Sequence, residues 1–233
     1  MTATTTPEIP TKTRVWMQTG PLDRNDKTDV EAIKKCIHLE EVPVPELKPQ
    51  QLLIKVERCT INPNELVHLF GTYVATENIP YPRPVGFEGS GTVVKSTASC
   101  FFPQVGQTVS FYAKQGGAHG DYVIADADSA FVFEPEKVSF SKAAASFVNP
   151  LTAVCMVDYA VSKGHKIFVH TAGASTVGRL LWTYAQECGV QMIHVVRKQE
   201  QVDFFVVHTF KASRWPRTVV SRAFNRANRL IFS

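Results

Sequence analysis

The residues best suited to binding a charged ligand lie in one stretch, IFVHTAGASTVGRLLW at positions 167–182. An apolar run is followed by small residues and then by an amphipathic pattern, which predicts a strand, a tight turn and a helix. Such a turn presents backbone N–H groups and a helix N-terminus to an anion, so it can hold a diphosphate. The residues expected to do this are Gly173, Ala174, Ser175, Thr176, Val177 and Gly178.

The second chemical feature follows the next predicted strand, QMIHVV at 191–196, which ends directly in Arg197 and Lys198. An acidic residue at this place favours a ribose hydroxyl, whereas a guanidinium suits a 2′-phosphate. The turn departs from G-x-G-x-x-G, because Ser175 stands at the middle glycine. The alternative is a plain strand-to-helix turn followed by a solvated arginine. Strand, turn and Arg197 together favour NADPH as the cofactor.

The predicted secondary structure that positions these residues changes near residue 145, from mainly strands to alternating helices and strands. Before it, short β-forming runs separated by prolines and turns predict a partly open antiparallel barrel, with a polar and partly helical insertion at 20–35. After a predicted N-cap at Ser141, helices and strands alternate: helix 150–160, strand 166–170, helix 176–188 stopped by Gly189, and strand 191–196. This order specifies a parallel β-α-β unit.

The charge is distributed unevenly along the chain. Residues 204–233 contain six basic residues and no acid, and removing these six from 25 leaves 19 basic against 21 acidic residues. The body therefore offers no basic surface for nucleic acid, and no apolar run reaches the roughly 18–20 residues that span a bilayer. The apolar and basic spacing after Pro216 is typical of a helix that binds membranes or acidic partners. We favour a divergent basic tail at 205–233 that is foreign to the preceding fold.

Cysteine usage adds a constraint on the compartment. The five cysteines are scattered and form no C-x-x-C pair. This pattern argues against a disulfide framework or a structural zinc lobe and suits a reducing environment. We therefore expect an intracellular protein, cytoplasmic or mitochondrial, without a membrane or nucleic-acid partner.

Further motifs carry a resemblance to a known family. In order along the chain they are NPNEL at 62–66, GTY at 71–73, VGFEGSG at 85–91, VNPLTA at 148–153 and the glycine turn. Over about residues 40–204 the chain resembles the zinc-independent medium-chain dehydrogenases/reductases, namely the 2-enoyl thioester reductases and quinone oxidoreductases. VVRKQEQV at 195–202 is closer to the enoyl reductases. Full-length relatives of this kind are often homodimers.

The resemblance implies an α/β protein with a β-barrel: a GroES-like barrel domain at 1–145, then an incomplete Rossmann domain at 146–204. The Rossmann domain is expected to be incomplete because only two of its parallel strands are recognised in the sequence. The chain is thus expected to be truncated relative to the family.

Zinc-using relatives carry Cys where Asn62 stands and His where Phe87 stands. Neither replacement is a zinc ligand, so we expect no catalytic metal. Glu88 is then interpreted as a buried or hydrogen-bonded acid, and His68 as a surface or packing residue. His119, in the glycine-rich segment 116–120, is expected to be exposed in a turn.

The resemblance also assigns roles near the substrate. Tyr73 matches the position of the proton donor, and a phenol with a pKa of about 10 stays protonated at neutral pH. The alternative is that Tyr73 packs against the barrel while water supplies the proton. Asn62 is expected to hydrogen-bond the substrate or a loop carbonyl, with a structural role as the alternative. Asn149 and Thr152 match positions near the nicotinamide, with helix capping as the alternative for Asn149.

Two functions follow from these residues. The first is NADPH-dependent reduction of activated C=C bonds in a small-molecule substrate, a 2-enoyl thioester or a quinone-like acceptor, by hydride transfer without zinc. The second is a non-catalytic fragment or pseudoenzyme that acts as a binding module, because much of the Rossmann domain is not recognised.

Overall fold

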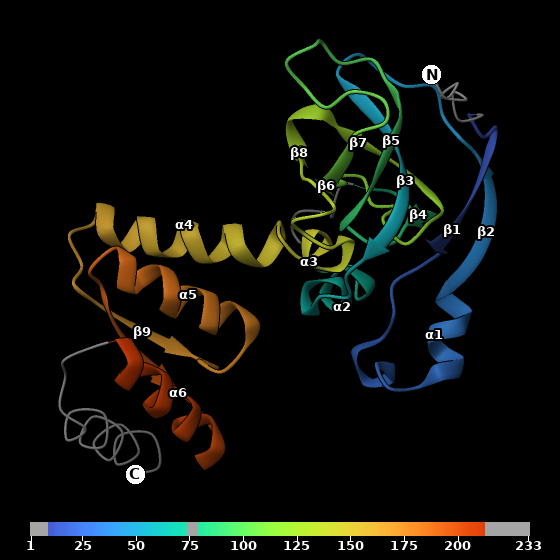
Figure 1. Ribbon diagram of the computed structural model, residues 1–233. Helices are drawn as coiled ribbons and strands as arrows, with labels where there is room; N and C mark the ends of the chain where they lie inside the picture. Colours follow the sequence, from blue (N-terminus) through green and yellow to red (C-terminus); the bar gives the residue numbers. More distant parts are fainter. Residues whose placement is uncertain (1–8, 74–78, 213–233) are drawn as a thin grey trace. The chain divides into compact units, whose positions relative to one another are not determined.

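The computed structural model describes residues 9–73 and 79–212. The chain divides into two compact units, Met1–Val148 and Asn149–Ser233, and each is described by itself (Figure 1).

The larger sheet of the first unit is antiparallel and has five strands in the order β7-β3-β5-β6-β8. Alternating apolar residues of these strands point into one core, in which Leu52, Ile54 and Phe111 are fully buried. The strands expected from the β-forming runs are therefore present. They are β3 (Gln51–Cys59), β5 (Glu88–Ser96), β6 (Thr108–Tyr112), β7 (Tyr122–Asp126) and β8 (Ala130–Val132).

A second, three-stranded sheet has the order β2-β1-β4 and is also antiparallel where its strands pair. Its strands are β1 (Lys12–Gln18), β2 (Ile37–Pro43) and the short β4 (Arg83–Pro84). Between β1 and β2 lie a 3-10 helix (Arg24–Asp26) and α1 (Val30–Cys36), capped by the side chains of Asp23 and Asp29. The polar, partly helical insertion expected at 20–35 is confirmed.

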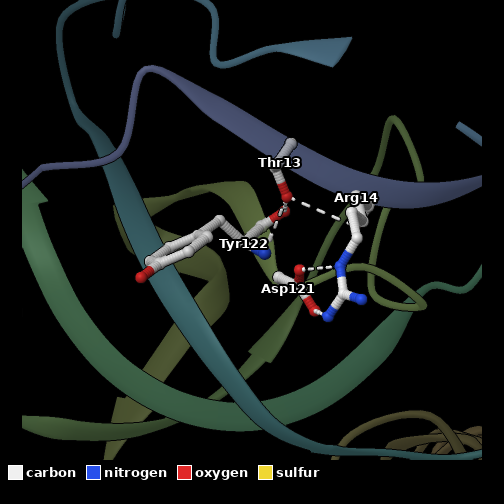
Figure 2. A network of polar contacts seen from close by, with 4 residues as sticks. All are labelled: Thr13, Arg14, Asp121 and Tyr122. Atoms are coloured by element: carbon white, nitrogen blue, oxygen red, sulfur yellow. Dashed lines mark hydrogen bonds and ion pairs between the residues drawn. The ribbon is translucent and has the colours of Figure 1, made fainter. Parts of the chain in front are cut away.

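The two sheets are joined where β1 passes the start of β7 (Figure 2). Arg14 makes a two-point contact with Asp121, from Nε to Oδ2 at 2.8 Å and from Nη2 to Oδ1 at 3.2 Å. Next to this pair, the Tyr122 N–H donates to the Thr13 hydroxyl oxygen at 3.0 Å. One contact uses the backbone N–H of Tyr122, and the other is a two-point ion pair. Together they fix the position of β1 along β7.

The described part of the first unit also contains three further short helices, each of which follows a strand along the chain. They are α2 (Pro63–Leu69), a 3-10 helix (Ala127–Ser129) and α3 (Phe140–Ala144). The N-cap expected at Ser141 is wrong: Ser139 caps α3, and its hydroxyl accepts from the Lys142 N–H at 3.4 Å. Both serines precede the alanine run, so sequence pattern alone does not distinguish them.

The second unit contains the predicted β-α-β order. Strands β9 (Ile167–Thr171) and β10 (Gln191–Val195) pair in parallel, which sets His170 beside His194. The chain then forms α6, which continues across residues 204 and 205, where the sequence predicted the start of the tail. The helices are α4 (Val148–Ser162), α5 (Thr176–Glu187) and α6 (Gln199–Ala212). Gly189, expected as the stop of α5, lies just beyond its C-cap at φ +68°.

The small core of the second unit lies between α4 and α5, which run side by side in Figure 1, and one face of the β9–β10 sheet. Val157 of α4 and Leu181 of α5 are fully buried there. The other face carries Ile167 and Val169, which are 55% and 62% exposed. One face of this sheet is therefore left uncovered by the described part of the chain.

Among the described residues, no helix has the length and apolar character needed to cross a bilayer.

Candidate functional site

The glycine turn between β9 and α5 is tight and is tied to the neighbouring strand. Ala172 has a φ of +53°, and the Ser175 N–H donates to its carbonyl at 2.9 Å. The Gly173 N–H donates to the carbonyl of Val195, the last residue of β10, at 3.1 Å. The turn and the carboxyl end of β10 are thus held together, as a dinucleotide site requires.

Ser175 is the N-cap of α5, and its hydroxyl accepts from the Gly178 N–H at 3.1 Å. The serine that replaces the middle glycine therefore satisfies one of the free donors at this helix end. The N–H groups of Ala174, Thr176 and Val177 make no hydrogen bond to any other residue in the described ranges. Three donors at one helix N-terminus remain available to an anion.

Two glycines of this turn leave no room for a side chain. A Cβ on Gly178 would lie 2.1 Å from the carbonyl oxygen of Gly173. A Cβ on Gly173 would lie 2.6 Å from the Cβ of His194 on β10. Both glycines are therefore required for the close packing of helix, turn and strand.

Arg197 and Lys198 follow β10 closely, and the strand ends at Val195, one residue earlier than predicted. Their backbone N–H groups donate to the side-chain oxygen of Gln201, at 3.1 and 3.2 Å, where α6 begins. Both residues are exposed, and within residues 9–73 and 79–212 neither forms an ion pair. Their assignment to a 2′-phosphate stays a prediction.

Arg179, which sequence reasoning missed, also touches the turn. Its Nε donates to the Ala174 carbonyl at 3.2 Å, and its guanidinium carbon lies 4.4 Å from the centre of the Phe204 ring on α6. The sequence could have indicated Arg179 by one feature: it is a cation near the first turn of a predicted helix, where the helix macrodipole disfavours positive charge. Recognising its role required Phe204, which is distant in sequence.

An aromatic and imidazole cluster lies next to the turn. The His194 ring stacks on Phe205 at 4.1 Å between centroids, and Trp182 meets both rings edge-on. Burial, and then the neighbouring His170, lower the pKa of His194 to about 4. His194 is therefore neutral at physiological pH and adds no positive charge to the site.

Asn149 and Thr152 lie in the N-terminal part of α4, in the same unit as the glycine turn. Asn149 is the second residue of α4, so it lies inside the helix and not at the cap. The capping alternative for Asn149 is wrong, and proximity to a nicotinamide stays a prediction for both residues.

A buried polar cluster surrounds Glu88 in the first unit. Its Oε1 accepts from Asn62 Nδ2 at 2.6 Å and from the Thr60 hydroxyl at 2.9 Å. Its Oε2 accepts from the Val148 N–H at 2.7 Å. Glu88 is fully buried, so the interpretation of a buried, hydrogen-bonded acid is confirmed. Asn62 donates its side-chain amide to this carboxylate, which favours the structural role over direct contact with a substrate.

His119 completes the same cluster, and the expectation that it is exposed is wrong. Its side chain is 16% exposed, with Nε2 at 2.8 Å from the Thr60 carbonyl and 3.3 Å from Glu65 Oε2. Gly116 and Gly117, both at positive φ, allow the segment to fold back against Gly86. Burial raises the pKa of Glu65, and the nearby His119 opposes that shift.

Tyr73 lies at one end of a row of aromatic rings. It is half-buried, and its ring centre is 6.2 Å from that of Phe87, which in turn is 6.3 Å from Tyr112. Tyr112 stacks on Phe147 at 5.4 Å. Burial, then Tyr73 and Glu88, raise the pKa of Tyr112. The unit thus presents two phenols near one another, of which the sequence identified only Tyr73.

The residues at the zinc positions do not fit a zinc ion. Phe87 is buried against the edge of the His68 ring at 4.8 Å, and Asn62 donates its amide to Glu88. No group of three or more His, Cys, Asp or Glu residues in the described ranges is arranged to hold a metal. His68 is fully buried, so the packing alternative is the correct one. Burial, followed by Glu65, raises the pKa of Cys59, so its thiol is not activated.

Comparison with known proteins identifies related chains. Residues 48–135 match the alcohol dehydrogenase GroES-like domain. A zinc-type alcohol dehydrogenase-like protein of Schizosaccharomyces pombe is 31% identical over 69% of this chain and 49% of its own length. Human quinone oxidoreductase is 30% identical (68% and 47% covered), and the mitochondrial enoyl-[acyl-carrier-protein] reductase of Arabidopsis thaliana is 27% identical (71% and 44%).

Among solved structures, a Mesorhizobium loti protein assigned as an NADPH:quinone reductase superposes with a TM-score of 0.68 at 30% identity. The match covers 84% of this chain and 58% of that structure. The chain spans about half the length of the curated relatives it matches. These likenesses confirm the expected fold class, a GroES-like domain followed by part of a Rossmann domain.

Replacing Glu88 by Gln tests the buried polar cluster. The amide retains one acceptor and sets two N–H groups against existing donors, so we expect the free energy of unfolding to fall by about 1–3 kcal/mol. Urea denaturation measures this change. Glu41→Gln, which removes an exposed carboxylate paired with Lys12, serves as the control and leaves the value nearly unchanged. Equal effects of the two substitutions would contradict the cluster's role.

Acidification tests the buried imidazole of His194. Its pKa is about 4 in the folded protein against about 6.5 when unfolded, so the unfolded state binds more protons between these values. The contribution of neutral His194 to the free energy of unfolding is complete above about pH 6.5 and is lost as the pH falls toward 4. Hydrogen exchange of the α5 and β10 amides between pH 7 and 4.5 measures it. His194→Leu reduces this pH dependence, whereas the same change at the exposed His165 leaves it intact.

Proposed function

We propose that this chain, which belongs to the medium-chain dehydrogenase/reductase superfamily, binds NADPH at the turn 173–178 and serves zinc-independent reduction of a small-molecule acceptor. One observation carries the proposal: three unpartnered N–H groups at the start of α5 adjoin the carboxyl end of β10, which continues into Arg197. This combination of helix-end donors and a following cation suits a diphosphate with an additional phosphate nearby.

The residues present fit the cofactor. Ala174, Thr176 and Val177 would donate backbone N–H groups to the diphosphate, while Gly173 and Gly178 permit its close approach to the backbone. Arg197, with Lys198 beside it, would hold the 2′-phosphate through charge-assisted hydrogen bonds. Asn149 and Thr152 are proposed near the nicotinamide. NADPH, when bound, supplies a hydride.

The first unit would supply the proton and hold the acceptor. Tyr73 is the proposed donor, because a phenol is protonated at neutral pH and can transfer its proton to the reduced substrate. Asn62 is proposed to act through Glu88, whose cluster fixes the start of α2. The His68 ring of α2 in turn contacts Phe87 of the row. The aromatic row from Tyr73 to Phe147 suits a flat, conjugated acceptor.

The acceptor class is proposed as activated C=C bonds, in quinone-like compounds or 2-enoyl thioesters. Relatives named for both activities support this range. The absence of a fitting zinc ligand set at Asn62 and Phe87 supports hydride transfer without metal activation of a carbonyl.

A second candidate function is a non-catalytic binding module. The exposed apolar face of β9, with Ile167 and Val169, favours it, because a complete Rossmann sheet is covered on both faces. Cofactor titration separates the candidates: NADPH quenching of protein fluorescence supports the reductase, and its absence at millimolar NADPH supports the binding module.

Replacing Arg197 by Gln tests the cofactor assignment. Loss of one charge-assisted contact, worth roughly 1.5–3 kcal/mol, should weaken NADPH binding about tenfold or more and leave NADH binding unchanged. Fluorescence titration of both nucleotides measures the two dissociation constants. Lys166→Gln, at another exposed cation of the same unit, is the control. Equal weakening of both nucleotides would exclude a 2′-phosphate contact.

Replacing Tyr73 by Phe tests the proton donor. We expect NADPH oxidation with crotonyl-CoA or a quinone panel to slow by about 10²-fold or more, while NADPH affinity is unchanged. Tyr112→Phe is the matched control, because it removes the neighbouring phenol and keeps the ring stack. If the Tyr112 variant slows turnover and the Tyr73 variant does not, the donor has been assigned to the wrong phenol.

A further inference from the structure

We infer that Arg179 is a second arginine of the cofactor site and discriminates NADPH from NADH by pairing with the 2′-phosphate. This inference rests on the proposed function, because it concerns the same turn. The sequence pattern points only to Arg197 and Lys198.

Two contacts hold the Arg179 guanidinium at the turn. Its Nε donates to the carbonyl of Ala174 at 3.2 Å, between the two glycines that shape the turn. Its guanidinium carbon lies 4.4 Å from the centre of the Phe204 ring, which is a cation–π distance. The side chain is therefore fixed between the turn and α6 before any ligand arrives.

The position of Phe204 decides which part of the nucleotide Arg179 would meet. Phe204 belongs to α6, which begins two residues after Arg197. Arg179 therefore extends to the side of the turn where β10 ends and α6 begins. In dinucleotide-binding folds, the end of the second strand recognises the substituent on the ribose 2′ oxygen.

The charges around Arg179 favour an anionic ligand. It lies near the N-terminus of α5, where the helix dipole disfavours a cation. No carboxylate in the described part of the chain pairs with it; Asp203 on α6 accepts instead from Gln199, at 3.0 Å. Its terminal nitrogens make no hydrogen bond to another described residue, so they suit two-point recognition of a phosphate.

The test compares NADPH and NADH binding by the full chain and by Arg179→Gln. We expect the dissociation constant for NADPH to rise about tenfold and that for NADH to stay unchanged. Arg179→Lys keeps the charge without the planar fork and should give an intermediate NADPH affinity. Lys163→Gln is the matched control, because Lys163 is also a cation above an aromatic ring, Tyr159, at 5.5 Å, but lies near the C-terminal end of α4.

The possible results distinguish failure of the Arg179 inference from failure of the proposed function. Equal weakening of both nucleotides, or no change for either, overturns the inference while the proposed function stands, because the wild-type chain still binds NADPH. Failure of the wild-type chain to bind either nucleotide overturns the proposed function and this inference with it. If circular dichroism shows that Arg179→Gln does not fold, Arg179→Lys decides by the same NADPH-to-NADH ratio.

Discussion

The approach of Gly178 to the carbonyl of Gly173 is the constraint on which the second unit depends. A methyl group there would lie 2.1 Å from the oxygen, so only glycine permits the first turn of α5 to close onto the turn. Ser175 Oγ accepts from the Gly178 N–H, while the N–H groups of Thr176 and Val177 have no acceptor because the first turn of a helix has no preceding turn. The glycine thus permits the packing of a helix end that can bind an anion.

The first unit is organised around a buried carboxylate. Glu88 accepts from a side-chain amide, a hydroxyl and a backbone N–H, which together compensate the cost of removing its charge from water. Two of these donors, Thr60 and Asn62, flank the turn into α2, and the third lies at the start of α4. Positions 62 and 87, which the resemblance compares with zinc ligands, carry an amide that serves this network and a buried apolar ring.

Much of the fold could be predicted because its elements have a clear local signature. The alternation of β-forming residues placed the five strands of the larger sheet, and the strand-turn-helix pattern at 167–182 placed β9 and α5. Errors arose where two local choices look alike. Ser139 and Ser141 are equally good caps in the sequence, and His119 in a glycine-rich segment resembles an exposed turn residue. Only the fold-back over Gly86 buries it beside Glu65.

The sequence by itself determined the strand, turn and helix at 167–182, the arginine after β10, and an amide and an apolar ring at positions 62 and 87. Each of these depends on residue types at fixed short spacings. The tertiary structure decided what no spacing records. It paired Arg179 with Phe204, His194 with Phe205 and Asn62 with Glu88. The reason is physical: ring stacking and buried hydrogen bonds act over a few ångströms, so they depend on which distant segments the packed strands and helices bring together.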